Sequence, residues 1–316
     1  MADHGGGGSV RHRAHVVVTL LGLAGLVALT LAVLAPSAHR VPGAGTDGTV
    51  GGASVAATSS SGPSSSGPST GTTTSSTSTA PGPRTLVALG DSVPSADTCG
   101  CTGYVEQVGE RLDVLTHRSW VVHNDATGGW RTSDVERDLS AAATRAHLAD
   151  ADLVLIEVGA NDFHLSRVDD PGCVPAASSG CWTSTLEGLR AGLTRIIHGI
   201  RRIDVRPDLR VVLFGYWNVT VDGKVGRAFG SQFVLGSDQL TRLVNITVQQ
   251  VATRTGAEYA DAYTPLKGEL GTRDPTSDLL QDGDHPNASG HALLAAAVVE
   301  ELSRVGALAV WTEGSR

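Results

Sequence analysis

The chain has 316 residues, a formal net charge of −8 and 41% hydrophobic residues. This charge excludes nucleic acid as a partner, because phosphate binding needs clustered Lys and Arg side chains. The composition changes twice along the chain, so we expect a single folded domain over residues 84–316, a length at which one α/β domain buries most of its apolar surface.

The first 35 residues have the pattern of a membrane segment. Residues 1–15 are basic near their end, and residues 16–35 form an unbroken apolar run. Twenty helical residues span about 30 Å, the thickness of the hydrocarbon core of a bilayer. We therefore expect a transmembrane signal-anchor whose N-terminus lies in the cytoplasm, since basic residues flank the cytoplasmic end. A cleaved signal peptide is the alternative, although its apolar part is usually shorter.

Residues 36–83 consist mainly of Ser, Thr, Gly and Pro. With so few large apolar side chains, such a segment cannot offset the entropy that folding costs. We expect a disordered linker, and we expect the domain that follows it to lie outside the cytoplasm, either anchored to the cell membrane or secreted after cleavage.

From residue 84 onward, short apolar runs alternate with longer amphipathic stretches. The runs predict strands at residues 85–89, 120–123, 153–158, 211–214 and 258–262. The amphipathic stretches predict helices at residues 104–112, 133–148, 183–203, 237–255 and 289–305. This alternation indicates an α/β fold with a mainly parallel five-stranded sheet and helices on both faces. Ligands bind such sheets at the carboxyl ends of the strands.

Four cysteines lie in the predicted domain, at Cys99, Cys101, Cys173 and Cys181. An even number in an exported protein predicts two disulfides. Pairing Cys173 with Cys181 is favoured because it closes a Pro/Gly/Ser-rich loop, and it leaves Cys99 to pair with Cys101; cross-links between the two loops are the alternative. The spacings C-x-C and C-x7-C do not match those of structural zinc sites, so no metal is expected.

Polar residues follow two of the predicted strands. After the first strand, Ser92 can present its hydroxyl and its backbone N–H at the edge of the sheet. After the third strand, Asn161 offers a side-chain amide, a neutral donor suited to an oxygen that gains charge during acyl transfer. Taken alone, each motif is more typical of a helix cap or a turn.

Near the C-terminus, Asp282 precedes His285 by three residues. A carboxylate at this spacing can accept a hydrogen bond from Nδ1, which leaves Nε2 free to take a proton from a nucleophile. Asp284 is the alternative partner, but its spacing fits less well. Together with Ser92 and Asn161, these residues fill every role that acyl transfer through a serine requires.

Four sequence blocks carry a resemblance to a known family: L-G-D-S at 89–92, N-D-A-T-G-G at 124–129, G-A-N-D at 159–162 and D-G-D-H-P-N at 282–287. Their order and spacing resemble those of the SGNH/GDSL hydrolases over residues 84–310. The cysteine-bearing inserts resemble those of secreted actinobacterial esterases and lipases in this family. The resemblance implies a three-layer flavodoxin-like fold, no metal and no cofactor.

Carried over residue by residue, the resemblance makes Ser92 the nucleophile, His285 the base and Asp282 its partner. It places the oxyanion donors at the backbone N–H groups of Ser92 and Gly129 and at the side chain of Asn161. Gly129 is preferred to its neighbour Gly128, because the residues that follow it then match the family pattern.

These expectations describe a monomeric, extracytoplasmic esterase that acts on a small-molecule, lipid or carbohydrate ester. Transfer of the acyl group to another alcohol would use the same residues. A surface-tethered binding module without catalysis is the alternative from another class, but a binder has no need for all four catalytic roles. Asp91 is expected to brace its loop by hydrogen bonds, and His291 is expected to have a structural role.

Overall fold

The computed structural model describes residues 82–313. The predicted membrane segment at residues 16–35, and all but the last two residues of the predicted linker, lie outside this range. Among the helices of residues 82–313, none is both long and apolar enough to cross a bilayer.

Five parallel strands form the single sheet of the described residues, in the order β2-β1-β3-β4-β5. Their bounds are β1 Arg84–Gly90, β2 Trp120–Asn124, β3 Leu153–Glu157, β4 Arg210–Phe214 and β5 Glu258–Ala260. The predicted parallel five-stranded sheet is thereby confirmed. Strand order reverses between β1 and β3, where Gly90 at the end of one strand pairs with Glu157 at the end of the other. This reversal is where a parallel sheet opens a crevice for a ligand.

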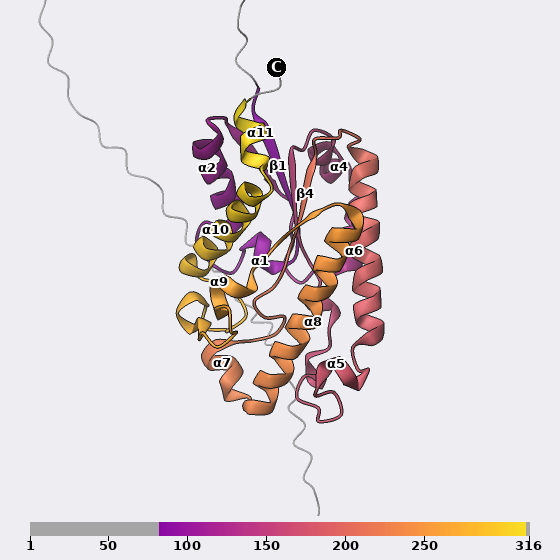
Figure 1. Ribbon diagram of the computed structural model, residues 1–316, viewed down its shortest axis with the longest axis vertical. Helices are drawn as coiled ribbons and strands as arrows, with labels where there is room; N and C mark the ends of the chain where they lie inside the picture. Colours follow the sequence, from indigo (N-terminus) through magenta and orange to yellow (C-terminus); the bar gives the residue numbers. More distant parts are fainter. Residues whose placement is uncertain (1–81, 314–316) are drawn as a thin grey trace, which may run out of the picture. The chain divides into compact units, whose positions relative to one another are not determined.

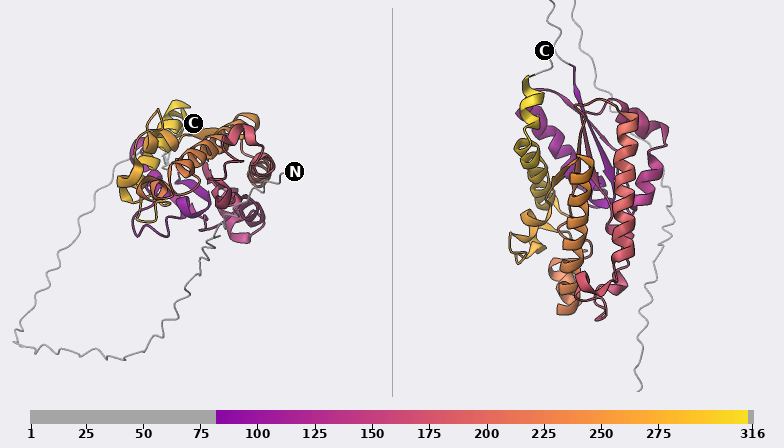
Figure 2. Two further views of the ribbon diagram at one scale, coloured as in Figure 1. Left: turned by 90° about the horizontal axis from the view of Figure 1, so that it is seen from below. Right: turned by 45° about the vertical axis from the view of Figure 1, so that its right-hand side comes forward.

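Helices cover both faces of the sheet, so the domain has three layers (Figures 1 and 2). One layer contains α2 Tyr104–Thr116, α9 Tyr263–Lys267, α10 Ala288–Arg304 and α11 Ala307–Glu313. The other contains α3 Thr132–Asp138, α4 Ala142–Ala149, α6 Thr183–Ile203 and α8 Ser231–Thr255. Successive residues of each strand point to opposite faces, so Leu86 and Val87 belong to different cores, the first packed with α10 and the second with α6.

Short helices connect the strands to the main helices at the carboxyl end of the sheet. They are α1 Ser92–Ser95, η1 Ala160–Asp162, η2 Leu165–Arg167, α5 Ala176–Ser179, α7 Gly223–Ala228 and η3 Pro275–Asp278. Figure 1 shows α5, α7 and the start of α8 extending beyond this end of the sheet. Both ends of the described chain, the start of β1 and α11, lie at the opposite end (Figure 1). The short helices and their loops therefore surround the carboxyl edge of the sheet, while both ends of the described chain lie at its amino edge.

The continuous helix predicted over residues 133–148 is wrong, because the structure has two helices there, α3 and α4. The break lies at Ser140 and Ala141. The Ser140 hydroxyl donates to the carbonyl oxygen of Arg137 at 2.7 Å, and the Ala141 N–H donates to that of Asp138 at 2.9 Å. A serine that bonds to the preceding turn offers the backbone an alternative to helix continuation.

The fifth strand ends two residues earlier than expected, at Ala260. The Asp261 carboxylate accepts a hydrogen bond from the Tyr263 N–H at 2.9 Å and so forms the turn into α9. Aspartate commonly closes such turns with its side chain.

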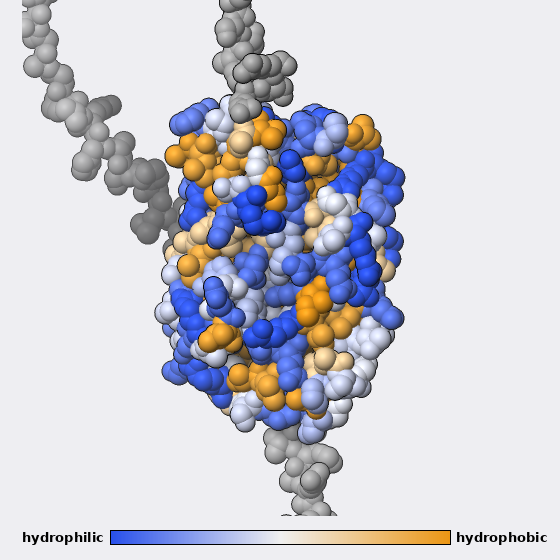
Figure 3. Space-filling view, in the orientation of Figure 1, coloured by the Kyte–Doolittle hydropathy of each residue, from blue (hydrophilic) through white to orange (hydrophobic). Residues whose placement is uncertain are grey.

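On the face of the domain shown in Figure 3, apolar residues form several separate groups between polar ones. The monomeric state expected from the sequence stays a prediction.

Gly236 in α8 allows this helix to approach the segment that follows Asn161. A Cβ atom at Gly236 would lie 1.9 Å from the carbonyl oxygen of Val168, whereas nothing lies within 4 Å of one at Gly188 in α6. We expect Gly236→Ala to lower the unfolding free energy by about 1–3 kcal/mol through overpacking. Gly188→Ala should raise it by roughly 0.5–1 kcal/mol, because alanine loses less backbone entropy in a helix. Urea unfolding of both variants measures the difference, and equal changes would contradict the close approach.

Candidate active site

The turn between β1 and α1 places Ser92 at the carboxyl edge of the sheet. Gly90 is required there, because a Cβ atom on it would lie 2.1 Å from the Glu157 carbonyl oxygen. Asp91 is the N-cap of α1 and accepts a hydrogen bond from the Val93 N–H at 3.1 Å. Ser92 is then the first helical residue, and none of the described residues accepts a bond from its N–H. Both its hydroxyl and its N–H are available to a substrate.

Asp91 joins three strand ends through one tyrosine. Its second carboxylate oxygen accepts a hydrogen bond from Tyr216 Oη at 2.6 Å, and the same Oη accepts one from the Ala160 N–H at 3.4 Å. Tyr216 follows β4, while Ala160 follows β3 and precedes Asn161. The bracing role expected for Asp91 therefore extends beyond its own loop to the loop that carries Asn161.

Asn161 is held in the short helix η1 by contacts with the start of α3. Its Nδ2 donates to the carbonyl oxygen of Trp130 at 2.9 Å, which occupies one of the two amide protons and leaves the other free. The neighbouring Asp162 carboxylate accepts bonds from the N–H of Thr132 at 3.1 Å and from its hydroxyl. These contacts bring Asn161 toward the loop that contains Gly128 and Gly129.

The two glycines of this loop have different surroundings. Gly129 has a φ of +79°, a conformation that favours glycine, and nothing lies within 4 Å of a Cβ atom built on it. A Cβ atom on Gly128 would lie 3.8 Å from Cβ of Ser92. Among the described residues, none accepts a hydrogen bond from the N–H of either glycine. The oxyanion role expected for Gly129 stays a prediction, and Gly128 is the one whose open side faces Ser92.

Asp282 and His285 contact each other in the loop before α10. Asp282 Oδ2 lies 2.7 Å from His285 Nδ1, and Oδ1 accepts the backbone N–H groups of Asp284 at 2.9 Å and His285 at 3.1 Å. Burial raises the pKa of Asp282, but the bonds from the imidazole and the two N–H groups outweigh it and hold the pKa below its usual value. None of the described residues bonds His285 Nε2, so this atom is free to exchange a proton.

Asp284, the alternative partner of His285, has a different environment. Its carboxyl group makes no hydrogen bond with the described residues. Although the residue is exposed at the surface, the protein atoms around the carboxyl group partly desolvate it and raise its pKa. The negative charge of Asp284 also helps to raise the pKa of Asp91, whereas His285 lowers it, so both residues lie within electrostatic reach of the Ser92 turn. The structure therefore agrees with the sequence spacing: Asp282, and not Asp284, is the hydrogen-bond partner of His285.

A cavity of about 220 Å³ lies at this edge of the sheet. Its lining includes Ser92, Asn161, Phe163, Tyr216, Asn218 and Asp284. A larger cavity of about 570 Å³ lies on the other side of the loop that carries His285, and its lining includes Leu280 and Gly283 but neither Ser92 nor Asn161. The smaller cavity is therefore the one that brings candidate nucleophile and oxyanion donor together.

The sequence did not single out Glu157, a buried acid next to the turn that carries Ser92. Glu157, the last residue of β3, is 0% exposed, and its carboxyl oxygens have no hydrogen-bond partner among the described residues. Burial raises the pKa of Asp91 to about 7 and that of Glu157 well above its usual value, and the charge of Asp91 raises the pKa of Glu157 further. A charged residue ending an otherwise apolar strand was the feature that could have revealed it.

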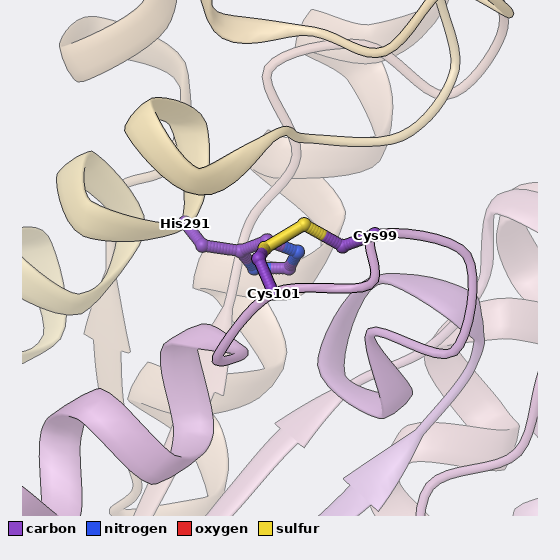
Figure 4. A group of neighbouring side chains, drawn as sticks. All are labelled: Cys99, Cys101 and His291. Atoms are coloured by element: carbon purple, nitrogen blue, oxygen red, sulfur yellow. A yellow bond between two sulfur atoms is a disulfide. The ribbon is translucent and has the colours of Figure 1, made fainter.

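Both predicted disulfides are present with the favoured pairing, Cys99 with Cys101 and Cys173 with Cys181. They lie in the inserts that follow Ser92 and Asn161 along the chain. Figure 4 shows the Cys99–Cys101 disulfide beside the ring of His291. Because both sulfurs are in a disulfide, neither is a thiolate that could bind a metal ion.

His291 has the structural role expected for it. It is 1% exposed, and its Nδ1 accepts a hydrogen bond from the Tyr104 N–H at 3.2 Å. Burial lowers its pKa to about 4, which keeps the ring neutral at physiological pH. His291 thus anchors the start of α2 to α10.

A family model described as the GDSL-like lipase/acylhydrolase family matches residues 88–293. Among solved structures, a lipase from a goat rumen metagenome is 16% identical, with a TM-score of 0.55 over 69% of this chain and 97% of that one. A lipase/acylhydrolase from Enterococcus faecalis is 21% identical, with a TM-score of 0.50 over 70% of this chain and 96% of that one. At these identities the structural similarity establishes the fold. No curated protein sequence matches the chain.

The buried acids Asp91 and Glu157 predict an unusual pH dependence of stability. Because both pKa values are raised on folding, the folded protein binds more protons than the unfolded chain between about pH 4 and pH 7. Stability is then highest at the acid end and falls by about 1.4 kcal/mol per pH unit for each extra proton. We expect a shallower fall in Glu157→Gln, measured by urea unfolding across this range. Identical slopes in both proteins would show that Glu157 is ionised in the folded state.

Proposed function

The chain belongs to the GDSL-like lipase/acylhydrolase family and is an ester-hydrolysing enzyme, and we propose that it works through an acyl-enzyme formed on Ser92. The observation that carries the proposal is the Asp282–His285 pair, 2.7 Å apart, in the loop whose Asp284 lines the same cavity as Ser92. A serine, a base oriented by a carboxylate, and free N–H donors at one cavity are what acyl transfer requires.

In the proposed first half-reaction, Ser92 Oγ attacks the carbonyl carbon of the ester while its proton passes to His285 Nε2. Asp282 holds the opposite side of the ring and stabilises the imidazolium that forms. The oxyanion accepts hydrogen bonds from the Ser92 N–H, from Asn161 Nδ2 and from the loop of Gly128 and Gly129. Collapse of this intermediate breaks the ester bond, and the alcohol leaves with the proton from His285.

The second half-reaction repeats these steps with water as the attacking group. Water gives a proton to His285 Nε2 as its oxygen bonds to the acyl carbon, and the bond to Ser92 Oγ breaks as that oxygen regains the proton. The free acid then leaves the site. A cavity of about 220 Å³ favours a small acyl group, and a small-molecule or carbohydrate ester fits this size better than a lipid.

We expect Ser92→Ala to reduce turnover of p-nitrophenyl acetate by about a thousandfold or more, because no other hydroxyl replaces the nucleophile. Ser95→Ala is the matched control, since it removes a hydroxyl one turn later in the same short helix. Ser95→Ala should keep its turnover and its labelling by a fluorophosphonate, whereas Ser92→Ala should lose both.

Three outcomes separate the proposal from its alternatives. Equal turnover in both variants would reject Ser92 as nucleophile. Labelling of Ser92 without hydrolysis, together with acyl transfer to an added alcohol, would indicate a transferase. Absence of both turnover and labelling in the unmodified protein would indicate a binding module.

We further propose that the domain lies outside the cytoplasm, held by the apolar segment at residues 16–35. Two disulfides support this location, because such bonds persist in oxidising compartments. Alkaline phosphatase, which is active only after export, should be active when it is fused after residue 83. The mass of the mature fusion then shows whether the segment is cleaved, and an inactive fusion would reject export.

A further inference from the structure

Asn218 in the loop after β4 has an amide orientation that its neighbours determine. Its Oδ1 accepts hydrogen bonds from the Thr220 N–H at 2.8 Å, from the Thr220 hydroxyl at 2.9 Å and from the Ser237 hydroxyl at 2.7 Å. A backbone N–H can only donate, so the atom facing it must be the amide oxygen. Ser237 is 0% exposed in α8, so Oδ1 points into the protein and Nδ2 points away from that interior.

The amide nitrogen of Asn218 has no partner. None of the described residues accepts a hydrogen bond from Nδ2, and although Asn218 as a whole is only 6% exposed, Nδ2 is not among the fully buried unpaired atoms and so remains accessible. The residue lines the cavity that also contains Ser92 and Asn161. An accessible N–H group at a cavity is satisfied by water or by a ligand that enters it. Nδ2 is thus a preoriented hydrogen-bond donor beside the proposed nucleophile.

Asp284 supplies an unpaired acceptor at the same cavity. It lines the cavity, its carboxyl group makes no hydrogen bond with the described residues, and its charge acts on Asp91 beside Ser92. The remaining lining includes Phe163 and Leu165, whose side chains are apolar. Beside the groups assigned to the reaction, the cavity therefore offers one further donor, Asn218 Nδ2, and one further acceptor, the Asp284 carboxylate.

We propose that Asn218 and Asp284 form a subsite for a free hydroxyl group of the substrate. The amide N–H donates to the hydroxyl oxygen, and the hydroxyl proton is donated to the Asp284 carboxylate. A hydroxyl group can pair with both residues at once, whereas an alkyl chain would displace water from the amide N–H of Asn218 without replacing its hydrogen bond. This inference rests on the proposed role of Ser92. It narrows the substrate class to esters that carry a hydroxyl near the scissile bond, such as partial esters of polyols or esters of hydroxy acids.

Two pairs of nearly isosteric esters test the subsite and locate the hydroxyl. In 2-hydroxyethyl acetate and propyl acetate, the hydroxyl or its methyl replacement is on the alcohol side; in ethyl glycolate and ethyl propionate, it is on the acyl side. With the full chain purified in detergent, we expect kcat/KM to favour the hydroxylated member of one pair by roughly tenfold or more. The pair that shows the preference identifies the side that Asn218 contacts.

Two substitutions probe the donor and the acceptor separately. Asn218→Asp keeps the oxygen that Thr220 and Ser237 require but replaces the donor with a negatively charged oxygen, which cannot donate to the oxygen of the substrate hydroxyl, so the preference should fall to near one. Asp284→Ala removes the acceptor from an exposed position and should also lower it. Gln281→Glu is the control, because it adds a negative charge in the same loop at a residue outside this cavity, and the preference should persist.

The preference is a ratio within one protein, so it does not depend on the active fraction of a variant. A ratio near one for both ester pairs in the unmodified protein, or a ratio that Asn218→Asp leaves unchanged, overturns the subsite. If Asn218→Asp does not fold, the ratio in Asp284→Ala decides. Turnover of none of the four esters with Ser92 still labelled by a fluorophosphonate rejects the substrate class alone, whereas absence of labelling rejects the proposed function as well.

Discussion

The hydrogen bond between Tyr216 and Asp91 is the contact on which the arrangement of the site depends. It joins the ends of β1 and β4, and through Ala160 it reaches the end of β3. Ser92 follows Asp91, Asn161 follows Ala160, and Asn218 lies two residues after Tyr216. The candidate nucleophile, oxyanion donor and hydroxyl-binding amide are therefore positioned by one buried tyrosine, while Asp282 and His285 come from a loop with internal contacts of its own.

The sheet could be predicted because its strands are apolar on both faces and are separated by amphipathic helices. What escaped prediction depends on contacts that are distant in the sequence or on hydrogen bonds of single side chains. The break at Ser140 depends on one hydroxyl bonding back to the preceding turn. The burial of Glu157 depends on the pairing of β3 with Gly90 of β1, and within β3 only the position of this acid at the end of an apolar run indicates it.

The residues of the candidate site also divide into those that local spacing predicts and those that depend on distant contacts or backbone torsions. The Asp282–His285 contact spans three residues, so spacing alone was enough to anticipate it. Gly128 and Gly129 are neighbours in one turn. The backbone torsions of this turn decide which of the two N–H groups faces the substrate, and a sequence motif does not specify them. Asn218 was not anticipated at all: its amide is oriented by the Thr220 N–H, but its place at the cavity and its contact with Ser237 depend on α8, a helix that begins thirteen residues after it.

The two ends of the described chain lie at the amino edge of the sheet, opposite the cavity (Figure 1). Neither end of the described chain therefore comes close to the cavity, so a segment joined to residue 82 or residue 313 enters the domain far from the candidate site. The same polarity means that immobilisation through either terminus, on a bead or an electrode, leaves the entrance to the cavity open.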